Sequence, residues 1–448
     1  MPQQIRLQNT PILACFKVGY QYKKNYPVEG SVINQLIIVN RSQHTVSRAA
    51  INAGALKVLY GLKRAGYQAC LVGGGVRDLL LNRRPKDFDV ATDALPEQVK
   101  QIFPQCHLIG RRFRLAHVRV DQEIVEVATF RAHYETGSGG QTEATGRIIR
   151  DNVYGSLEED AYRRDFTVNA LYYSIHDFSI IDYVGGMADL NQRLLRLIGD
   201  AEQRYREDPV RMLRAVRFAA KLNFTLDSVT AQMILPLGEL LRDIPSARLY
   251  EEVLKLFLSG HAVASFEGLA EYGLLPRLFP HLASADTWPL KGLLLSALKQ
   301  TDQRVTEDKS VSPAFLFAAL LWQPVQEQLQ LQVPSDSPQR ALHEAIQAVL
   351  SEQQAYVSLP QRILRPMFDI WGLQSAFNTR KGGKKALRFL QHPSFRAAYD
   401  FLWLRIEMGS EDPALGEWWR KAQENQTEPG VVVVEKKPRR RRKKWTQT

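Results

Sequence analysis

The sequence predicts an α+β protein in which a mixed sheet packed with helices comes first and helices follow almost to the end. Residues 47–180 contain both short runs of alternating apolar residues, which are typical of strands, and apolar residues at helical spacing. From about Glu202 the alternation nearly disappears, and segments rich in Leu, Ala and Arg dominate. After Gln423 a short Val run leads into a basic stretch that we expect to be disordered.

These shifts divide the 448 residues into five regions, because a chain of this length exceeds what one core can hold. We expect a poorly ordered extension over 1–46, an α+β head over 47–180, a helical neck over 181–265, a helical body over 266–423 and a disordered basic tail over 424–448.

The head is expected to begin with a helix capped by Ser47, followed by an apolar strand over residues 69–72. Three glycines and a short helix lead from that strand to a second one that carries Asp87 and Asp89. A helix opened by Pro96 comes next. Alternation over 113–121 and 123–131 then predicts an antiparallel hairpin, and the Gly/Ser/Thr-rich stretch 136–146 predicts a loop. We expect the helices on one side of this sheet.

The composition favours a polyanionic partner and argues against secretion or membrane insertion. The net charge is +12, and Lys436 to Lys444 supply more than half of the excess, which points to nucleic acid. The 3 scattered cysteines fit a reducing cytosol and no disulfide framework. The longest apolar run, 314–322, is too short to span a bilayer. We therefore expect a cytoplasmic protein with no transmembrane segment.

The glycine turn and the acidic pair predict a site for phosphates and metal ions. Side chains alternate along a strand, so Asp87 and Asp89 should share one face while Phe88 enters the core. Such a carboxylate pair suits Mg²⁺ or Mn²⁺. Gly73 and Gly74 let backbone N–H groups approach phosphate oxygens. The glycine spacing does not fit a dinucleotide-binding dehydrogenase.

The order strand, glycine pair, helix, strand and Asp-x-Asp resembles the nucleotidyltransferase superfamily that includes DNA polymerase β. The blocks 71–78 (LVGGGVRD), 163–170 (RRDFTVNA) and 207–218 (EDPVRMLRAVRF) are similar to its class II group, which holds bacterial poly(A) polymerases and CCA-adding enzymes. The segments 108–118, 313–319 and 392–400, together with the basic tail, resemble the poly(A) polymerase I family. This resemblance covers roughly residues 45–410, and the loop 136–146 is short for it.

The resemblance implies a third catalytic carboxylate beside Asp87 and Asp89, and two residues compete for the role. Asp165 belongs to the Arg-Arg-Asp block that the class II resemblance marks as functional, and we favour it. Glu126 is a charge within the apolar alternation of 124–130. The alternative to a catalytic role is an ion pair at a helix end for Asp165. For Glu126 it is a structural ion pair with Arg131.

A second group is implied to hold the incoming nucleotide. Asp208 and Arg211, three residues apart, offer an acceptor and a donor that could read a base edge, although a plain ion pair between them is the alternative. Forked arginines suit phosphates. The predicted nucleotide-binding residues are Gly73, Gly74, Arg77, Arg164, Asn169, Asp208, Arg211, Arg214 and Arg217.

Basic clusters predict the RNA-binding surface. One cluster in the body is interleaved with Phe377, Phe389 and Phe395, which could serve as stacking platforms. We expect His117, which lies in an apolar strand, to be a packed core histidine rather than a catalytic base. The predicted RNA-binding residues are Arg111, Arg112, Arg380, Lys381, Lys384, Lys385, Arg388, Arg439, Arg440, Arg441 and Arg442.

The resemblance, added to the metal and phosphate site, implies a template-independent polynucleotide adenylyltransferase that adds AMP from ATP to RNA 3′ ends with two Mg²⁺ (or Mn²⁺) ions and so promotes RNA decay. A CCA-adding tRNA nucleotidyltransferase is the closest alternative, and a non-catalytic RNA-binding protein on the same fold is a second. The expected partners are ATP, RNA 3′ ends and RNA-decay proteins, and we expect a monomer.

Overall fold

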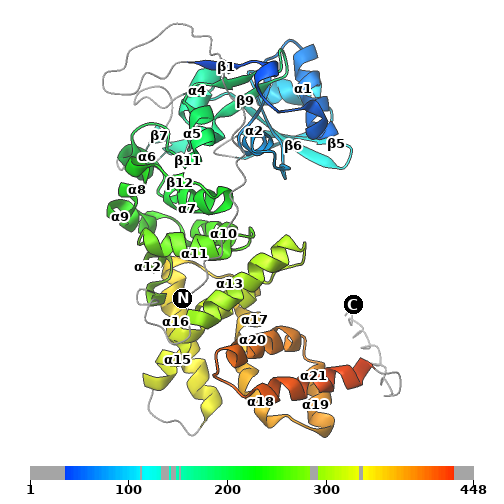
Figure 1. Cartoon of the computed structure of the whole chain (residues 1–448), viewed down its shortest axis with the longest axis vertical. Coiled ribbons are helices and arrows are strands. Elements are labelled where there is room, and N and C mark those ends of the chain that lie inside the picture. The colour runs from blue at the N-terminus through cyan, green and yellow to red at the C-terminus, as the bar shows by residue number, and fades with distance from the viewer. Residues whose placement is uncertain are drawn as a thin grey trace, which may run out of the picture. The chain divides into compact units, whose positions relative to one another are not determined.

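The computed structural model describes residues 36–110, 114–132, 141–142, 148–150, 153–282, 291–331 and 337–427. The chain divides into two compact units (Figure 1). The first unit holds Met1–Pro245 with Glu267–Arg277, and the second holds Ser246–Phe266 with Leu278–Thr448. Each unit is described by itself.

An eight-stranded mixed sheet forms the centre of the first unit, as predicted. The strand order is β1-β10-β9-β2-β3-β6-β5-β4, and β3–β6 is the parallel pair among antiparallel neighbours. The strands are β1 (Ile37–Val39), β2 (Ala69–Val72), β3 (Asp89–Thr92), β4 (Cys106–Ile109), β5 (Leu115–Val120), β6 (Glu123–Thr129), β9 (Leu171–Ser174) and β10 (Ile180–Asp182). The predicted hairpin is confirmed as β5 and β6, which turn at Asp121 with a positive φ of 55°.

The expectation of a poorly ordered segment over 1–46 is wrong for its last part. β1 pairs with β10 at the edge of the sheet, and Val39 and Val46 are buried. A strand of three residues is too short to leave a readable alternation, so the periodicity of the sequence does not reveal it.

Helices cover both faces of the sheet, which corrects the expectation of helices on one side. α1 (Ala53–Arg64) and α3 (Pro96–Ile102) contact β5 and β6. A separate core cluster joins Cys70, Val72 and Tyr172 of the strands to Ala161 of α4 (Leu157–Tyr162). The sheet is therefore enclosed between two helical layers, and β2 is buried along its whole length.

The neck belongs to the same unit as the head. The last sheet strand ends at Asp182, and α5 (Gly186–Gln192), α6 (Ala201–Glu207) and α7 (Val210–Leu222) follow. Arg83 donates hydrogen bonds from the end of α2 (Gly74–Leu80) to the carbonyls of Lys221 and Leu222 at the end of α7. The remaining strands and α-helices of this unit are β7 (Gln141–Thr142), β8 (Ile148–Arg150), β11 (Leu194–Leu195), β12 (Thr225–Leu226), α8 (Ser228–Gln232) and α9 (Ile234–Leu237).

The second unit is helical throughout its described residues, as predicted. One core cluster packs Phe377, Phe389, Phe395 and Trp419 against one another. Its helices are α10 (Ser246–Phe257), α13 (Lys291–Thr306), α14 (Pro313–Leu320), α15 (Trp322–Leu331), α16 (Pro338–Tyr356), α17 (Gln361–Gly372), α18 (Gln374–Thr379), α19 (Gly383–Leu390), α20 (Phe395–Glu407) and α21 (Pro413–Thr427). Two more helices, α11 (Ala262–Glu271) and α12 (Leu275–Leu278), each have residues in both units.

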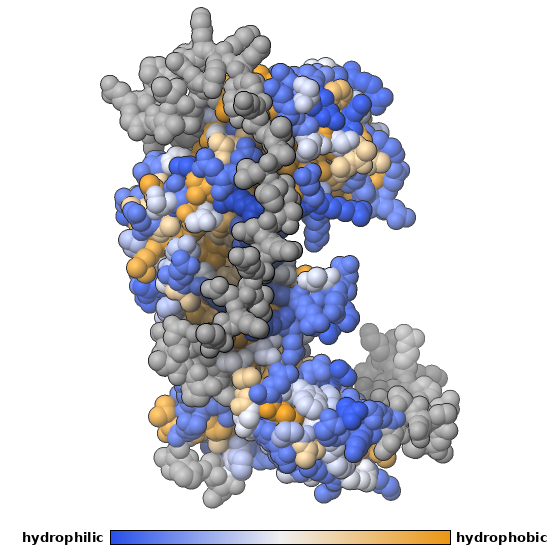
Figure 2. Space-filling view, viewed as in Figure 1, coloured by the Kyte–Doolittle hydropathy of each residue, from blue (hydrophilic) through white to orange (hydrophobic). Residues whose placement is uncertain are grey.

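The described part of the chain contains no helix long and apolar enough to cross a membrane. In the view of Figure 2, hydrophilic residues cover most of the described surface and apolar residues form scattered patches.

Candidate nucleotidyl-transfer site

A row of side chains crosses the sheet at the level where β3 begins. The strand register places Asp89 directly beside Val72 of β2 on one side and Glu126 of β6 on the other. Glu126 in turn lies opposite His117 of β5. Residues directly opposite on neighbouring strands point to the same face. The row therefore brings two carboxylates and an imidazole together on one face of the sheet.

Asp87 precedes the strand rather than lying within it, because β3 begins at Asp89. Phe88 is buried between two exposed aspartates, so the predicted alternation of core and solvent positions is confirmed. Gly75 fixes this approach: a Cβ at Gly75 would lie 3.3 Å from the carbonyl oxygen of Asp87 and 3.4 Å from the ring of Phe88. The backbone of Asp87 and Phe88 therefore packs closely against Gly75, which leaves no room for a larger residue there.

The carboxylate of Asp89 is held in a negatively charged environment. Desolvation by the surrounding protein raises its pKa to about 6, and the charges of Glu126 and Asp87 add to the effect, while Arg164 opposes it. Among the described residues, no hydrogen bond or ion pair engages Asp87 or Asp89. Such a site favours the binding of a cation.

Oxygen-ligated divalent cations fit these carboxylates, although the described residues contain no ready-made group of three or more metal-binding side chains. His117 lies 3.6 Å from Glu126, measured from Nε2 to the carboxylate, and its side chain is only partly buried. His117 is therefore a neighbour of the acidic row rather than a core residue enclosed by apolar side chains.

The turn before α2 depends on Gly73. Its φ of 74° and ψ of −140° lie in a region that residues with a Cβ rarely adopt. A Cβ at this position would face Nη1 of Arg164 at 3.7 Å. Arg164 is anchored from its other edge by Asp160, at 2.9 Å, and by the hydroxyl of Tyr172, at 2.9 Å. The predicted residues Gly73 and Arg164 therefore meet, with Nη1 of Arg164 turned toward the glycine turn.

Arg77 occupies a different place from the predicted contact with triphosphate. Its side chain is buried, and it donates to Asp78 at 2.7 Å and to Asn169 at 2.6 Å. Burial disfavours direct contact with a nucleotide, and the geometry instead makes Arg77 a link between α2 and the segment around Asn169.

Asp165 is engaged in an ion pair with Arg214. Arg214 of α7 binds its carboxylate at 2.5 Å, and Asn169 and the backbone N–H of Phe166 donate to it as well. Burial alone would raise the pKa of Asp165, but the charge and hydrogen bonds of Arg214 outweigh it and lower the pKa to about 2. Asp165 thus joins the head to the neck helix.

This ion pair makes a testable contribution to stability. Because the folded pKa lies below the ordinary value of 3.8, the contribution is fully present above about pH 4 and is lost as the pH falls through about 2. We expect Asp165→Asn to lower the free energy of unfolding at pH 7 by about 2 kcal/mol. Urea unfolding from pH 7 to pH 3 should show the gap between wild type and variant narrowing below pH 4, and a gap independent of pH would contradict the assignment.

The predicted base-reading residues lie at the junction of α6 and α7. Asp208 follows the last residue of α6, and Arg211 sits in the first turn of α7. Nη1 of Arg211 binds Glu207 at 2.8 Å and the carbonyl of Arg204 at 2.6 Å. The simple Asp208–Arg211 ion pair considered from the sequence is therefore replaced by a Glu207–Arg211 pair.

Arg204 connects this junction to the segment that carries Arg163 and Arg164. Its Nη2 donates to the carbonyls of Arg163 and Arg164 at 2.7 and 2.5 Å, and its Nη1 binds Glu207 at 2.8 Å. Burial and the neighbouring charge of Arg211 lower the pKa of Arg204 to about 10. Sequence reasoning missed Arg204, because nothing in its spacing separates it from a surface arginine of an amphipathic helix.

Phe218 organises the remaining predicted arginines. The guanidinium carbons of Arg77, Arg214 and Arg217 lie 5.4, 5.2 and 4.4 Å from the centre of its ring. Cation–π contacts of this kind hold arginines in place beside one another. Phe218 therefore gathers three of the predicted residues.

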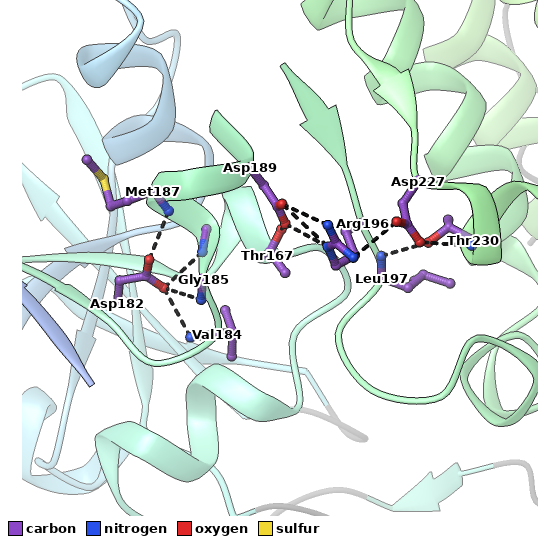
Figure 3. A network of polar contacts seen from close by, with 11 residues as sticks. Thr167, Asp182, Val184, Gly185, Met187, Asp189, Arg196, Leu197, Asp227 and Thr230 are labelled. Carbon is purple, nitrogen blue, oxygen red and sulfur yellow. Dashed lines mark hydrogen bonds and ion pairs between the residues drawn. The ribbon is translucent and has the colours of Figure 1, made fainter. Parts of the chain in front are cut away.

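A polar network supports the segment that carries Asp165 and Asn169 (Figure 3). Thr167 donates to Asp189 of α5 at 2.6 Å, and Arg196 bridges Asp189 and Asp227 at 3.2 and 3.1 Å. Asp182 accepts four backbone N–H groups from the turn that opens α5. These contacts hold α5 to the end of strand β10 on one side and to the start of α8 on the other.

The basic cluster of the body lies on the surface of the second unit. We name Arg380, Lys381, Lys384, Lys385 and Arg388 the α18–α19 basic cluster. All five side chains are exposed. The prediction that Phe377, Phe389 and Phe395 act as stacking platforms is wrong, because these rings are buried in the core. Their spacing reflects the apolar face of the helices rather than an open surface.

Several predicted residues fall outside the described part of the chain. They are Arg111, Arg112, Arg439, Arg440, Arg441 and Arg442, and most of the predicted loop 136–146 falls there too.

Three family models match parts of this chain. Residues 69–196 match the family model described as the poly A polymerase head domain. Residues 223–286 match the probable RNA and SrmB-binding site of polymerase A, and residues 335–447 match the polymerase A arginine-rich C-terminus.

Individual relatives separate two groups within the superfamily. Poly(A) polymerase I of Escherichia coli O6:H1 is 49% identical over 401 residues, covering 87% of this chain and 86% of the relative. The CCA-adding enzyme of Lactobacillus johnsonii is 41% identical over 220 residues, covering 49% of this chain and 54% of the relative.

Solved structures show the same fold. The Thermotoga maritima CCA-adding enzyme complexed with tRNA has a TM-score of 0.57 at 17% identity, and the alignment covers 89% of this chain and 88% of that structure. The match to poly(A) polymerase I covers 87% of this chain, whereas the match to the CCA-adding enzyme covers 49%. This chain therefore belongs to the poly(A) polymerase I family.

Proposed function

We propose that this chain transfers AMP from ATP to the 3′-hydroxyl of RNA without a template, and that Asp87, Asp89 and Glu126 form its catalytic centre. The observation that carries the proposal is the register of Asp89 and Glu126 on adjacent strands, beside a glycine turn. The family assignment makes polynucleotide adenylyl transfer the activity that these residues serve.

Glu126 is the better third carboxylate on this geometry. It lies beside Asp89, and its charge contributes to the raised pKa of that residue. The carboxylate of Asp165 is instead neutralised by Arg214. We therefore assign Asp165 to positioning the neck helix, in place of the catalytic role expected from its sequence block.

Asp87, Asp89 and Glu126 would hold two Mg²⁺ ions, or Mn²⁺ in their place. When bound, these ions would supply the Lewis acidity that activates the RNA 3′-hydroxyl and stabilises charge on the α-phosphate and pyrophosphate. The chain's own residues place the substrates: the turn at Gly73 offers backbone N–H groups, and Nη1 of Arg164 offers a charged donor toward phosphate oxygens.

Arg211 and Asp208 are proposed to read the adenine base. Glu207 and the carbonyl of Arg204 hold one edge of the Arg211 guanidinium. Within the described residues no hydrogen bond engages its Nε or Nη2, so that edge can donate to a base. A base that cannot accept this hydrogen bond leaves the Arg211 donor without a partner, which lowers the affinity for that base.

Arg211→Ala should therefore reduce the preference for ATP over CTP by about tenfold, mainly through a higher KM for ATP. Steady-state incorporation with each nucleotide measures the ratio. Arg206→Ala is the matched control, because Arg206 lies on α6 but forms an exposed ion pair with Glu202. An unchanged ratio in Arg211→Ala would remove it from base reading.

The α18–α19 basic cluster and the basic tail are proposed to bind the RNA backbone. Each phosphate neutralised by a Lys or Arg contributes a little under one unit to the slope of log affinity against log salt. Lys384→Gln with Lys385→Gln should therefore weaken RNA binding and flatten this slope by about one to two units in filter-binding assays. A lower affinity with an unchanged slope would argue against phosphate contact.

Product analysis tests the function itself. Wild-type protein, an unstructured RNA and a tRNA lacking its CCA end are incubated with ATP and CTP together. We expect long tails of A on both RNAs. Addition that stops after C-C-A on the tRNA would establish a CCA-adding enzyme instead, and RNA binding without any incorporation would establish a non-catalytic protein.

A monomeric state, association with RNA-decay proteins, and promotion of RNA decay by the A tail are part of the same proposal. They rest on the family assignment.

A further inference from the structure

The second unit contains a cleft remote in sequence from the proposed catalytic residues. Its volume is about 570 Å³, within the range of small-molecule and cofactor sites. Residues of α15, α16, α17, α18 and α20 line it, all within Ser246–Phe266 and Leu278–Thr448. A nucleobase fits this volume with room for water.

Aromatic rings form one wall of this cleft. His343 of α16 and Phe368 of α17 lie with ring centres 5.9 Å apart and an interplanar angle of 40°. His343 is exposed and Phe368 is half-buried, so both rings retain an accessible surface. Trp322 lies deeper, with the guanidinium of Arg405 5.4 Å from its ring centre. Flat rings beside a cation are typical of sites where a base stacks.

Polar groups on the same lining are fixed in orientation. Gln374 is buried, and its amide nitrogen donates to the carbonyls of Ile370 and Ala398. Its side-chain oxygen accepts from Arg405, which also binds Glu411 at 2.7 Å. Ser375 and Thr379 add exposed hydroxyl groups. Hydroxyls next to a held guanidinium can pair with the edge of a heterocycle.

One helix that lines the cleft leads along the chain into the α18–α19 basic cluster. α18 lines the cleft with Gln374, Ser375 and Thr379, and Arg380 is the next residue of the chain. Arg380, Lys381, Lys384, Lys385 and Arg388 are exposed beyond it. The lining of the cleft and the basic cluster are therefore consecutive along the chain.

We propose that this cleft receives one unstacked nucleobase of the RNA whose backbone binds the α18–α19 basic cluster. The proposal rests on the RNA-binding part of the proposed function and adds a base-binding site to it. Charge complementarity favours RNA over an apolar peptide, because α18, which lines the cleft, leads directly into the five exposed cationic residues of the α18–α19 basic cluster. Stacking tolerates any base, so the site adds affinity without selecting a sequence.

The test uses full-length protein and Phe368→Leu, which removes the aromatic ring and keeps an apolar side chain. Tyr356→Leu is the matched control, since Tyr356 lies on α16, is also half-buried and does not line the cleft. Binding of a fluorescently labelled 12-nucleotide RNA is measured at several salt concentrations. An RNA of the same length with abasic residues is the second ligand.

We expect Phe368→Leu to weaken binding of the normal RNA by about tenfold with an unchanged salt slope. Binding of the abasic RNA should be the same for wild type and variant, and Tyr356→Leu should match wild type throughout. Circular dichroism and thermal unfolding check that both variants fold. His343→Leu, at an exposed position, should reproduce the effect if Phe368→Leu proves unstable.

Equal binding of normal RNA by wild type, Phe368→Leu and His343→Leu would overturn the proposal. Equal losses on normal and abasic RNA would also overturn it, because the cleft would then not recognise a base. A cleft that serves a protein partner would give the first of these results. Incorporation of AMP is not part of this readout, so failure of the transferase proposal is seen separately in the product assay.

Discussion

Asp89→Asn is expected to lower the rate of AMP incorporation by about 10³-fold or more while leaving RNA affinity unchanged. Asn keeps the size of the side chain but removes the charge that a divalent cation requires. Asp87→Asn should have a comparable effect, because the turn held by Gly75 brings Asp87 to the same end of β3. Single-turnover incorporation of labelled AMP, with RNA binding measured in parallel, gives both quantities.

Asp121→Asn is the control for this pair of variants. Asp121 is exposed at the β5–β6 turn and pairs with Lys57, and Asn tolerates its positive φ. It should retain wild-type incorporation. Near-normal incorporation by Asp89→Asn would show that the acidic pair does not carry the chemistry.

The second large effect separates Glu126 from Asp165. Glu126→Gln should lower kcat by at least about a hundredfold with little change in stability, because Glu126 is a half-exposed member of the acidic row. Asp165→Asn should instead lower stability and raise the KM for ATP, because it releases Arg214. The two kinetic profiles are opposite in kcat and KM, so one set of assays distinguishes the residues.

A hundredfold loss of kcat in a folded Asp165→Asn, with Glu126→Gln near wild type, would reverse the assignment. The variant would then have removed a group that acts only in the transition state.

Much of the head could be predicted from the sequence because its signals are local. Alternation predicted the β5–β6 hairpin, and the order of glycines and aspartates predicted that the glycine turn lies next to Asp87 and Phe88. The helical character of the neck, which includes α7, followed from the loss of alternation after about Glu202. Each of these features depends on neighbours within about a dozen residues, which a sequence displays directly.

Contacts between distant strands and helices could not be predicted in this way. Whether Glu126 or Asp165 meets Asp89 depends on the parallel pairing of β3 with β6, which no local pattern encodes. The sequence predicts Arg77 as a phosphate ligand, whereas its burial against Asp78 and Asn169 depends on contacts that the sequence does not display. The spacing of Phe377 from its neighbouring aromatic residues also does not reveal whether its ring faces the core or solvent, and the ring is buried.

Counting bound metal ions tests the central claim, that Asp87, Asp89 and Glu126 form the transfer centre, most directly. Mn²⁺ is titrated by electron paramagnetic resonance into the full chain with an ATP analogue that cannot transfer AMP. Two Mn²⁺ per wild-type chain are expected, together with at least about tenfold weaker binding in Glu126→Gln and unchanged binding in Asp165→Asn. Unchanged binding in Glu126→Gln together with lost binding in Asp165→Asn would contradict the account.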